Sequence, residues 1–217
     1  MKIAKVVPIY KKGDPSDISN YRPISLLSSF SKILEKIIYS RTIKFIRSFE
    51  ILSDSQFGFR QKHSTTHAIL YFINHIATAV DSHLHTVGIF LDLSKAFDTI
   101  DHKILLSKLS HYGIRGKALE WYRSYLSGRK QFVSINDSNS DYNDIICGVP
   151  QGSLLGPLLF ILFINDFHNS SQLLSFILFA DDTSVFFSHK NPDTLLNAIN
   201  TELECVYTIG FVVINFL

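Results

Sequence analysis

The sequence predicts an α+β fold in which helices pack on an antiparallel sheet. Short segments rich in β-branched and aromatic residues alternate with longer amphipathic segments along the chain. Residues 174–187 place two apolar runs around an acidic pair, the pattern of an antiparallel hairpin. With 217 residues, 46% of them hydrophobic, the chain has enough apolar material for one domain, or one domain with a lobe.

The first half of the chain predicts one strand and two helices. Residues 2–10 (KIAKVVPIY) indicate a strand, and residues 11–23 a basic turn region punctuated by Gly13, Pro15 and Pro23. Residues 28–49 have apolar side chains at helical spacing and a polar face of Lys and Arg. Residues 64–80 are a second candidate amphipathic helix.

The second half predicts strands between helices. Residues 86–93 (TVGIFLDL) indicate a strand that ends in a carboxylate, and residues 174–187 two strands around a tight Asp181-Asp182 turn. We expect helices at residues 94–112, 116–126, 158–167 and 195–206, a strand at 131–135, and a glycine-bearing loop at 148–156. The apolar run 154–164 is about half the length a bilayer needs, so a buried helix with Pro157 in its first turn is expected there.

Charge and cysteine content narrow the function classes. Residues 1–62 hold 12 Lys+Arg and 5 Asp+Glu, a balance of +7, while residues 63–217 hold 9 and 14, a balance of −5. This asymmetry favours a lobe that grips phosphates beside a lobe that holds metal, with an ordinary solvated surface as the alternative. Two distant cysteines, Cys147 and Cys205, argue against a disulfide framework or a structural zinc site. We expect no signal peptide, because the first dozen residues lack an apolar core.

Three acidic residues stand out because their neighbours are apolar. Asp181 and Asp182 interrupt FILFADDTSVFF, and Asp92 follows GIFL. Burying adjacent acids in such surroundings is costly without a compensating charge, so a metal site explains them better than a plain turn, which usually carries Gly or Asn. Two Mg²⁺ ions bridged by such carboxylates can activate an attacking hydroxyl and stabilise a triphosphate leaving group.

Several segments match known motifs in order and spacing. FLDLSKAFDTIDH (90–102), GVPQGSLLGPLLFILFINDF (148–167) and FADDTSVF (179–186) resemble motifs A, B and C of reverse transcriptases from non-long-terminal-repeat retrotransposons. Residues 4–38 and 55–69 resemble the fingers motifs of that family, and residues 121–133 its segment between A and B. The chain is similar to the LINE-type group, nearest its jockey-like branch, over nearly its whole length.

The resemblance implies a right-hand polymerase with fingers and palm. It predicts a fingers-like basic region at 1–85 and a palm at 86–217, with motif B proper at 148–157. It also implies that the endonuclease and the thumb of the family are missing from this sequence. The implied activity is RNA-directed DNA synthesis from deoxynucleoside triphosphates on an RNA template and a DNA primer, with two Mg²⁺ ions, or Mn²⁺ in their place. No membrane partner is expected, and the family's target-primed integration implies a nuclear location.

The resemblance also assigns the site residues. Asp92, Asp181 and Asp182 are the implied catalytic metal ligands, Asp182 being the weaker third. The implied nucleotide-binding set is Lys11, Arg22, Phe97, Gln151 and Gly152, with Phe97 as the steric gate against a 2′-hydroxyl. Lys12 is a further candidate for contacting phosphates. The implied template-binding set is Gln56, Phe57, Gly58, Arg60, Gly148 and Pro150. For each single Lys or Arg, a solvated surface charge is an equal alternative.

Other interpretations stay open at this point. A viral RNA-dependent RNA polymerase shares the palm, but Ala180 in place of Gly and the aromatic Phe97 disfavour it. A catalytically inactive nucleic-acid-binding remnant of a mobile element is the second alternative. His63 and His67 have metal-ligand spacing but no Glu between them, so they favour a helix surface over a zinc site.

Overall fold

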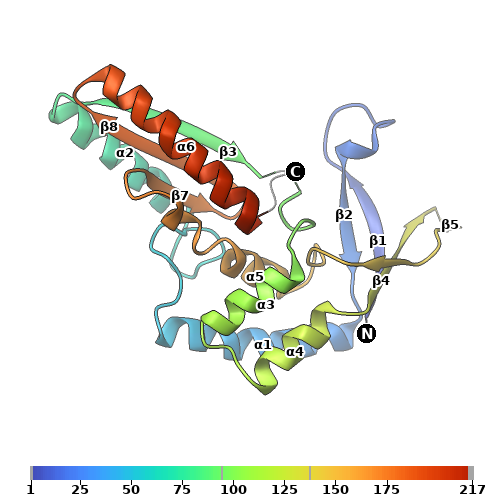
Figure 1. The fold of residues 1–217 in the computed structure, drawn as a ribbon. Coiled ribbons are helices and arrows are strands. Elements are labelled where there is room, and N and C mark those ends of the chain that lie inside the picture. The colour runs from blue at the N-terminus through green and yellow to red at the C-terminus, as the bar shows by residue number, and fades with distance from the viewer. Residues whose placement is uncertain (1, 94, 137, 215–217) are drawn as a thin grey trace. The chain divides into compact units, whose positions relative to one another are not determined.

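The computed structural model describes residues 2–93, 95–136 and 138–214 (Figure 1). The chain forms two compact units, each made of two separate stretches of sequence. Unit 1 comprises Met1–Phe49 and Phe97–Phe160, and unit 2 comprises Glu50–Ala96 and Ile161–Leu217. The mixture of helices and sheets agrees with the α+β prediction. The division at residue 85 into fingers and palm is a functional one and stays a prediction.

Unit 1 contains a sheet in the order β2-β1-β4-β5, with β6 also paired to β4. Its strands are β1 (Ile3–Tyr10), β2 (Tyr21–Leu26), β4 (Arg129–Ile135), β5 (Ser138–Asn139) and β6 (Asn143–Ile145). A short 3-10 helix, η1 (Ile18–Asn20), precedes β2. β1 and β2 form an antiparallel hairpin, whereas β1 and β4 are parallel, so this sheet joins segments more than a hundred residues apart.

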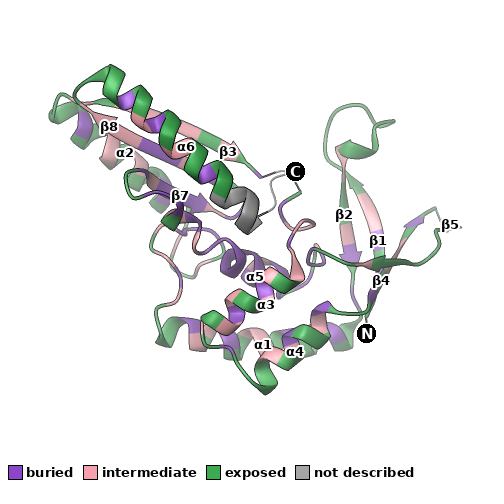
Figure 2. Cartoon of the chain, viewed as in Figure 1, coloured by how far each residue is buried: buried purple, intermediate pink, exposed green. Residues whose placement is uncertain are grey.

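Unit 1 also contains three helices, in which buried and exposed residues alternate (Figure 2): α1 (Ser29–Ser48), α3 (His102–His111) and α4 (Lys117–Leu126). The Ser28 hydroxyl caps α1 by accepting the Ser31 N–H, as expected for a serine at this position. The Tyr122 hydroxyl of α4 lies 2.6 Å from the Thr42 hydroxyl of α1. Tyr122 is only 2% exposed, and burial raises the pKa of its phenol to about 12.

The apolar run at 154–164 forms α5 (Gly156–Phe163), which is buried almost throughout and is followed by the 3-10 helix η2 (Phe167–Ser170). Pro157 lies in its first turn, as predicted. The helix is shorter than the predicted 158–167 at its C-terminal end. Within the described part of the chain, no helix combines the length and apolarity that crossing a bilayer requires.

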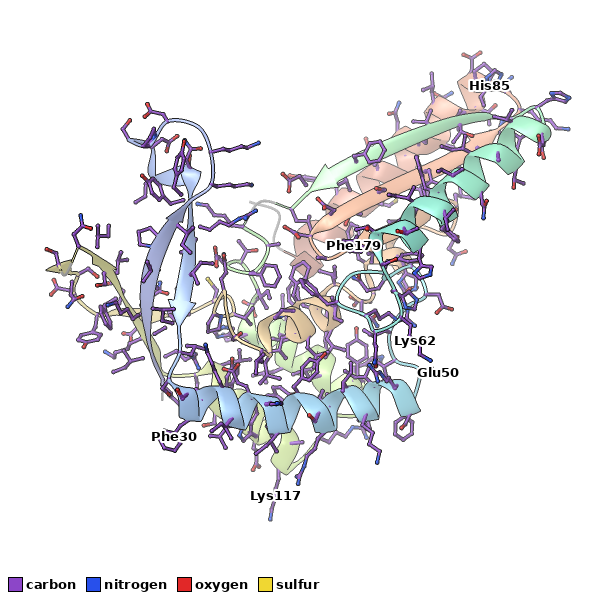
Figure 3. All side chains as sticks on the ribbon, turned by 180° about the vertical axis from the view of Figure 1, so that it is seen from behind. Phe30, Glu50, Lys62, His85, Lys117 and Phe179 are labelled. Carbon is purple, nitrogen blue, oxygen red and sulfur yellow. The ribbon has the colours of Figure 1, made fainter. Side chains whose placement is uncertain are left out.

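Unit 2 is built on a three-stranded antiparallel sheet in the order β3-β8-β7. Its strands are β3 (His85–Asp92), β7 (Ser175–Phe179) and β8 (Asp182–His189). The helices α2 (Thr65–Asp81) and α6 (Pro192–Ile214) cover opposite faces of this sheet (Figures 1 and 3). On the α2 side, Phe57, Ala68, Ile177 and Phe186 form a buried cluster, with Phe72 and Phe179 packed against it.

The predicted helix at 94–112 is wrong in its first half. Residues 95–98 form turns, and α3 begins only at His102, where the Asp101 carboxylate accepts the N–H groups of Lys103 and Ile104. The carbonyl oxygens of Phe97 and Ile100 accept N–H groups from the distant residues Val149 and Gly148 instead of bonding along a helix. Tertiary hydrogen bonds therefore replace the local ones that amphipathic spacing predicted.

Candidate active site

Two of the three predicted metal ligands lie side by side at one end of the unit 2 sheet. Asp92, the last residue of β3, is the Cα partner of Asp182, the first residue of β8, and Asp182 also pairs with Phe179 of β7. Directly opposed residues of an antiparallel pair project from the same face, with Cβ atoms about 4.5–5.5 Å apart. Both carboxylates therefore project from the sheet face that α2 covers, and both are exposed.

The third carboxylate belongs to the turn between β7 and β8. The two turn residues are Ala180 and Asp181, so the predicted Asp181-Asp182 turn is wrong by one residue. Ala180 has φ +57°, and among the two turn residues only Ala180 has a positive φ. A positive φ at the first central residue is the property for which type II′ hairpin turns use glycine, so alanine is strained here. Asp181 is half-buried.

The donor chemistry of this acidic end fits a divalent cation. Mg²⁺ prefers carboxylate oxygens, and no side chain of the described residues neutralises these three acids through a hydrogen bond or an ion pair. The described residues nevertheless contain no group of three or more His, Cys, Asp or Glu gathered closely enough to hold a metal ion. Asp92 and Asp182 are thus paired, but the three carboxylates are not gathered into one ligand cluster.

The predicted nucleotide-binding loop is held within unit 1 by the segment that follows Phe97. The Gly148 N–H donates to Ile100 O (2.8 Å), the Val149 N–H to Phe97 O (2.8 Å), and Nε2 of His102 lies 2.7 Å from Gly148 O. A Cβ on Gly148 would lie 2.6 Å from the Asp98 carbonyl oxygen, and its φ is +79°. Only glycine suits this position, because both the conformation and the close approach exclude a side chain.

Gln151 is oriented by a charge-assisted pair of hydrogen bonds. Its Nε2 donates to both carboxylate oxygens of Asp98, at 3.0 and 2.9 Å. Phe97, adjacent to Asp98 in sequence, stacks on Phe160 with ring centroids 4.8 Å apart. The predicted steric gate, Phe97, and the residue that orients the predicted glutamine, Asp98, are therefore neighbours in the sequence.

A buried carboxylate supports the same loop. Glu35 of α1 is 1% exposed; its Oε2 accepts the Leu154 N–H (2.7 Å) and its Oε1 accepts the Tyr125 hydroxyl (3.0 Å). Burial and the nearby Glu35 charge raise the pKa of Tyr125, which keeps its hydroxyl protonated as a donor. Sequence reasoning missed Glu35, which looked like one polar residue of an amphipathic helix. It also missed Asp98, although its position beside Phe97 could have indicated a role.

The predicted phosphate-binding residues lie on the β1–β2 hairpin of unit 1. Lys11 and Lys12 follow β1 and Arg22 lies in β2, and all three side chains are exposed. The loop of Gln151 is bonded to this hairpin, since the Ser25 N–H donates to Gln151 O at 2.7 Å. A Cβ on Gly152, whose φ is +105°, would lie 3.0 Å from Ser25 O.

The predicted template-binding residues of unit 2 lie mostly in its interior. Gln56 and Phe57 are 0% and 8% exposed, Gly58 is buried, and the half-buried Arg60 guanidinium donates to Ser53 O at 2.7 Å. A template contact through the side chains of Gln56 or Phe57 requires exposure that these residues lack here. Pro150 is likewise buried in unit 1. His63 and His67 lie 6.3 Å apart between ring centroids and belong to no metal-holding group of the described residues.

Comparison with known proteins decides the family. The profile of the family "Reverse transcriptase (RNA-dependent DNA polymerase)" matches residues 9–213. The chain belongs to the reverse transcriptase family. This reverse transcriptase chain is 36% identical over 201 residues to the "Probable RNA-directed DNA polymerase from transposon BS" of Drosophila melanogaster, covering 86% of this chain and 21% of the relative.

Further relatives place it among non-LTR retrotransposon polymerases. It is 33% identical over 198 residues to the RNA-directed DNA polymerase from mobile element jockey of Drosophila melanogaster, covering 88% of this chain and 22% of that protein. The chain thus spans about a fifth of the length of these relatives. Among solved structures, telomerase from Candida tropicalis superposes with a TM-score of 0.62 at 14% identity, covering 92% of this chain and 38% of that one. This likeness shows the fold and agrees with the predicted fingers and palm.

Proposed function

We propose that the chain is the polymerase core of a mobile-element reverse transcriptase and adds deoxynucleotides to a primer 3′-hydroxyl on an RNA template. The pairing of Asp92 with Asp182 carries the proposal. It places two unneutralised carboxylates at the end of one sheet, with Asp181 immediately before Asp182 in the sequence. An unneutralised pair of carboxylates of this kind attracts divalent cations.

Two Mg²⁺ ions, or Mn²⁺, would be held by Asp92, Asp181 and Asp182. When bound, they would supply Lewis-acid stabilisation to the attacking 3′-hydroxyl and to the pyrophosphate leaving group. The chain's own contribution is to concentrate negative charge at this point and to position the substrates. The strained turn at Ala180 supports a functional role, because strain is retained where the geometry is needed.

Substrate selection would belong to the unit 1 loop. Phe97, braced by Phe160, would exclude a 2′-hydroxyl by occupying its space, and Gln151, oriented by Asp98, would hydrogen-bond the nucleotide or the template. Arg22 and Lys11 would bind triphosphate oxygens, a role that suits their exposure on the β1–β2 hairpin. We further propose residues 1–85 as fingers, residues 86–217 as palm, and a nuclear site of action, because integration requires access to chromosomal DNA.

Primer extension tests this proposal directly. The purified chain is incubated with poly(rA)/oligo(dT), dTTP and Mg²⁺ or Mn²⁺, with Asp181→Asn as the matched inactive variant. Metal-dependent extension that the variant lacks supports the proposed chemistry. If extension is absent while salt-sensitive RNA binding persists, the chain is a nucleic-acid-binding remnant and the catalytic proposal fails.

A further inference from the structure

Residues 55–58, which we call the buttress segment, extend the unit 2 sheet beyond β7. Gln56 forms a parallel bridge with Leu178. The Phe57 N–H donates to Leu178 O at 2.7 Å, and the Leu178 N–H donates to Ser55 O at 2.8 Å. The edge of β7 that leads into the Ala180–Asp181 turn is therefore covered by a backbone from a distant part of the sequence.

Gly58 lies directly against this turn. A Cβ built on Gly58 would lie 2.2 Å from the Ala180 nitrogen and 2.9 Å from the Phe179 carbonyl carbon, distances that real Cβ atoms do not reach. The φ of Gly58 is not positive, so glycine is required here by space and not by backbone conformation. Because the opposing atoms are backbone, no side-chain rotation can relieve the contact.

The buttress segment is itself fixed by two side chains that sequence analysis assigned to the template. Oε1 of the fully buried Gln56 accepts the Gly58 N–H at 2.7 Å. Nη1 of Arg60 donates to Ser53 O at 2.7 Å and to Gln56 O at 3.3 Å. The amide oxygen of Gln56 and the guanidinium of Arg60 therefore hold the backbone that carries Gly58.

Asn165 anchors the residues that come just before the buttress segment. The Ser53 N–H donates to its Oδ1 at 2.9 Å, and its Nδ2 donates to Ile51 O at 2.8 Å. Asn165 is 5% exposed. The segment is thus pinned before and after the residues that contact β7, which makes it a rigid support and not a loop free to follow a nucleic acid.

We propose that Gly58 and Gln56 are positioning residues for the Ala180–Asp181 turn. The close approach of Gly58 to Ala180 holds the turn in its positive-φ conformation, and this fixes where the Asp181 and Asp182 carboxylates lie relative to Asp92. The inference rests on the proposed function, since it concerns the geometry of the proposed metal ligands. It replaces template contact as the role of Gln56 and Gly58, and of Arg60 as their support.

A pair of glycine-to-alanine variants tests this role. Gly58→Ala forces the turn to move, whereas Gly88→Ala, in β3 of the same sheet, meets nothing closer than 3.9 Å. The readouts are the affinity for Mn²⁺, followed by electron paramagnetic resonance, and kcat and KM in primer extension. We expect Gly58→Ala to weaken Mn²⁺ binding about tenfold and to lower kcat by about 10- to 100-fold, with template KM within about twofold. Gly88→Ala should match the wild-type protein in all three.

A second variant covers the case in which Gly58→Ala does not fold. Gln56→Leu removes the acceptor of the Gly58 N–H without adding a clash, and Gln56→Glu keeps it. We expect Gln56→Leu to shift the amide resonances of Ala180 and Asp181 and to weaken Mn²⁺ binding, and Gln56→Glu to shift them less. If Gln56→Leu leaves the Mn²⁺ affinity unchanged but raises the KM for template, the proposal is overturned in favour of template contact.

The amide resonances also separate this inference from the proposed function. If the wild-type protein shows no metal-dependent extension, the proposed catalysis fails. The positioning role is then supported if Gly58→Ala or Gln56→Leu shifts the amide resonances of residues 179–182 and Gly88→Ala does not. It is overturned if neither of the first two variants shifts them.

Discussion

Asp92 and Asp182 are directly opposed across the antiparallel pairing of β3 and β8. Like charges at directly opposed positions of a sheet repel one another, so this pairing costs stability until a cation neutralises it. The protein retains this unfavourable pair at one end of the unit 2 sheet. Such an arrangement links the stability of unit 2 to cation binding.

We therefore expect divalent cations to stabilise the protein. A saturating Mn²⁺ concentration, about 100 times the dissociation constant, should add about 2.7 kcal/mol to the free energy of unfolding. Asp182→Asn should abolish most of this gain, yet raise stability by a few tenths of a kcal/mol in EDTA, because the repulsion is gone. Thermal denaturation with and without Mn²⁺ measures both effects. Asp141→Asn, an exposed site in unit 1, serves as control, and an equal Mn²⁺ gain in both variants would contradict the assignment.

Removing the ring of Phe97 should relax sugar discrimination. In Phe97→Ala the space beside Phe160 opens, and a 2′-hydroxyl no longer meets a side chain. The ratio of kcat/KM for ribonucleotides to that for deoxynucleotides should rise about 10- to 200-fold. Phe132→Ala, which truncates a half-buried ring of β4, controls for loss of packing. A ratio that stays constant in Phe97→Ala rules out the gate.

Changing Asp98 should affect nucleotide binding through Gln151. Asp98→Asn offers one oxygen in place of two and adds a donor that faces the Gln151 amide. Loss of a charge-assisted bond corresponds to about 1.5–3 kcal/mol, so the KM for deoxynucleotide should rise about tenfold or more, with kcat changed less. Steady-state kinetics on a fixed primer–template measure this split. A drop in kcat alone would point to a different role.

Glycine at position 180 should relieve backbone strain. Ala180 has φ +57°, a conformation that glycine adopts without a steric penalty. Ala180→Gly should raise the free energy of unfolding by about 1 kcal/mol, because the relieved strain exceeds the added flexibility of the unfolded chain. Ala77→Gly, at an exposed helical position of α2, should instead lose about 1 kcal/mol. Urea denaturation compares the two, and loss of stability in both would show that the turn is unstrained.

Alkaline pH should destabilise unit 1 through Tyr122. Burial raises the pKa of this phenol to about 12, above the value of about 10 in the unfolded chain. Between these two pH values the phenol is deprotonated in the unfolded chain but still protonated in the folded protein. The free energy of unfolding is therefore highest below pH 10 and falls as the pH rises, by about 1 kcal/mol per pH unit. Urea titrations at pH 9, 10 and 11 should show a shallower decline in Tyr122→Phe. Tyr142→Phe, an exposed ring, should keep the wild-type slope.

Sequence patterns located most elements because their signals are local. The strand at β1 and the helices α1, α2 and α4 follow from β-branched runs, helical spacing and serine or glycine at their starts. The predicted helix at 94–112 failed because carbonyl oxygens at its start are taken by residues 148–149. No local pattern encodes a partner fifty residues away.

The residues of the candidate site also fall into those that the sequence could identify and those that it could not. The motif carboxylates and Phe97 could be identified from spacing and resemblance, because their chemistry is carried by residue type. The place of Gln56 and Gly58 could not, since an aromatic residue near Arg60 suggests a template-binding segment until the burial of Gln56 and Phe57 is known. Glu35 was missed for a related reason: a single buried acid in an amphipathic helix is indistinguishable in sequence from its solvated neighbours.

The interleaving of the two units along the chain has a consequence for biosynthesis. β1 is translated before its parallel partner β4, which begins more than a hundred residues later, so unit 1 cannot close until that stretch has been translated. At about 5–20 residues per second this delay lasts several seconds, during which β1 has its hairpin partner β2 but lacks β4. Neither unit can fold before the other has begun to be made. The nascent polypeptide should consequently depend on chaperones that hold it, and slower translation should lower rather than raise the yield of folded protein.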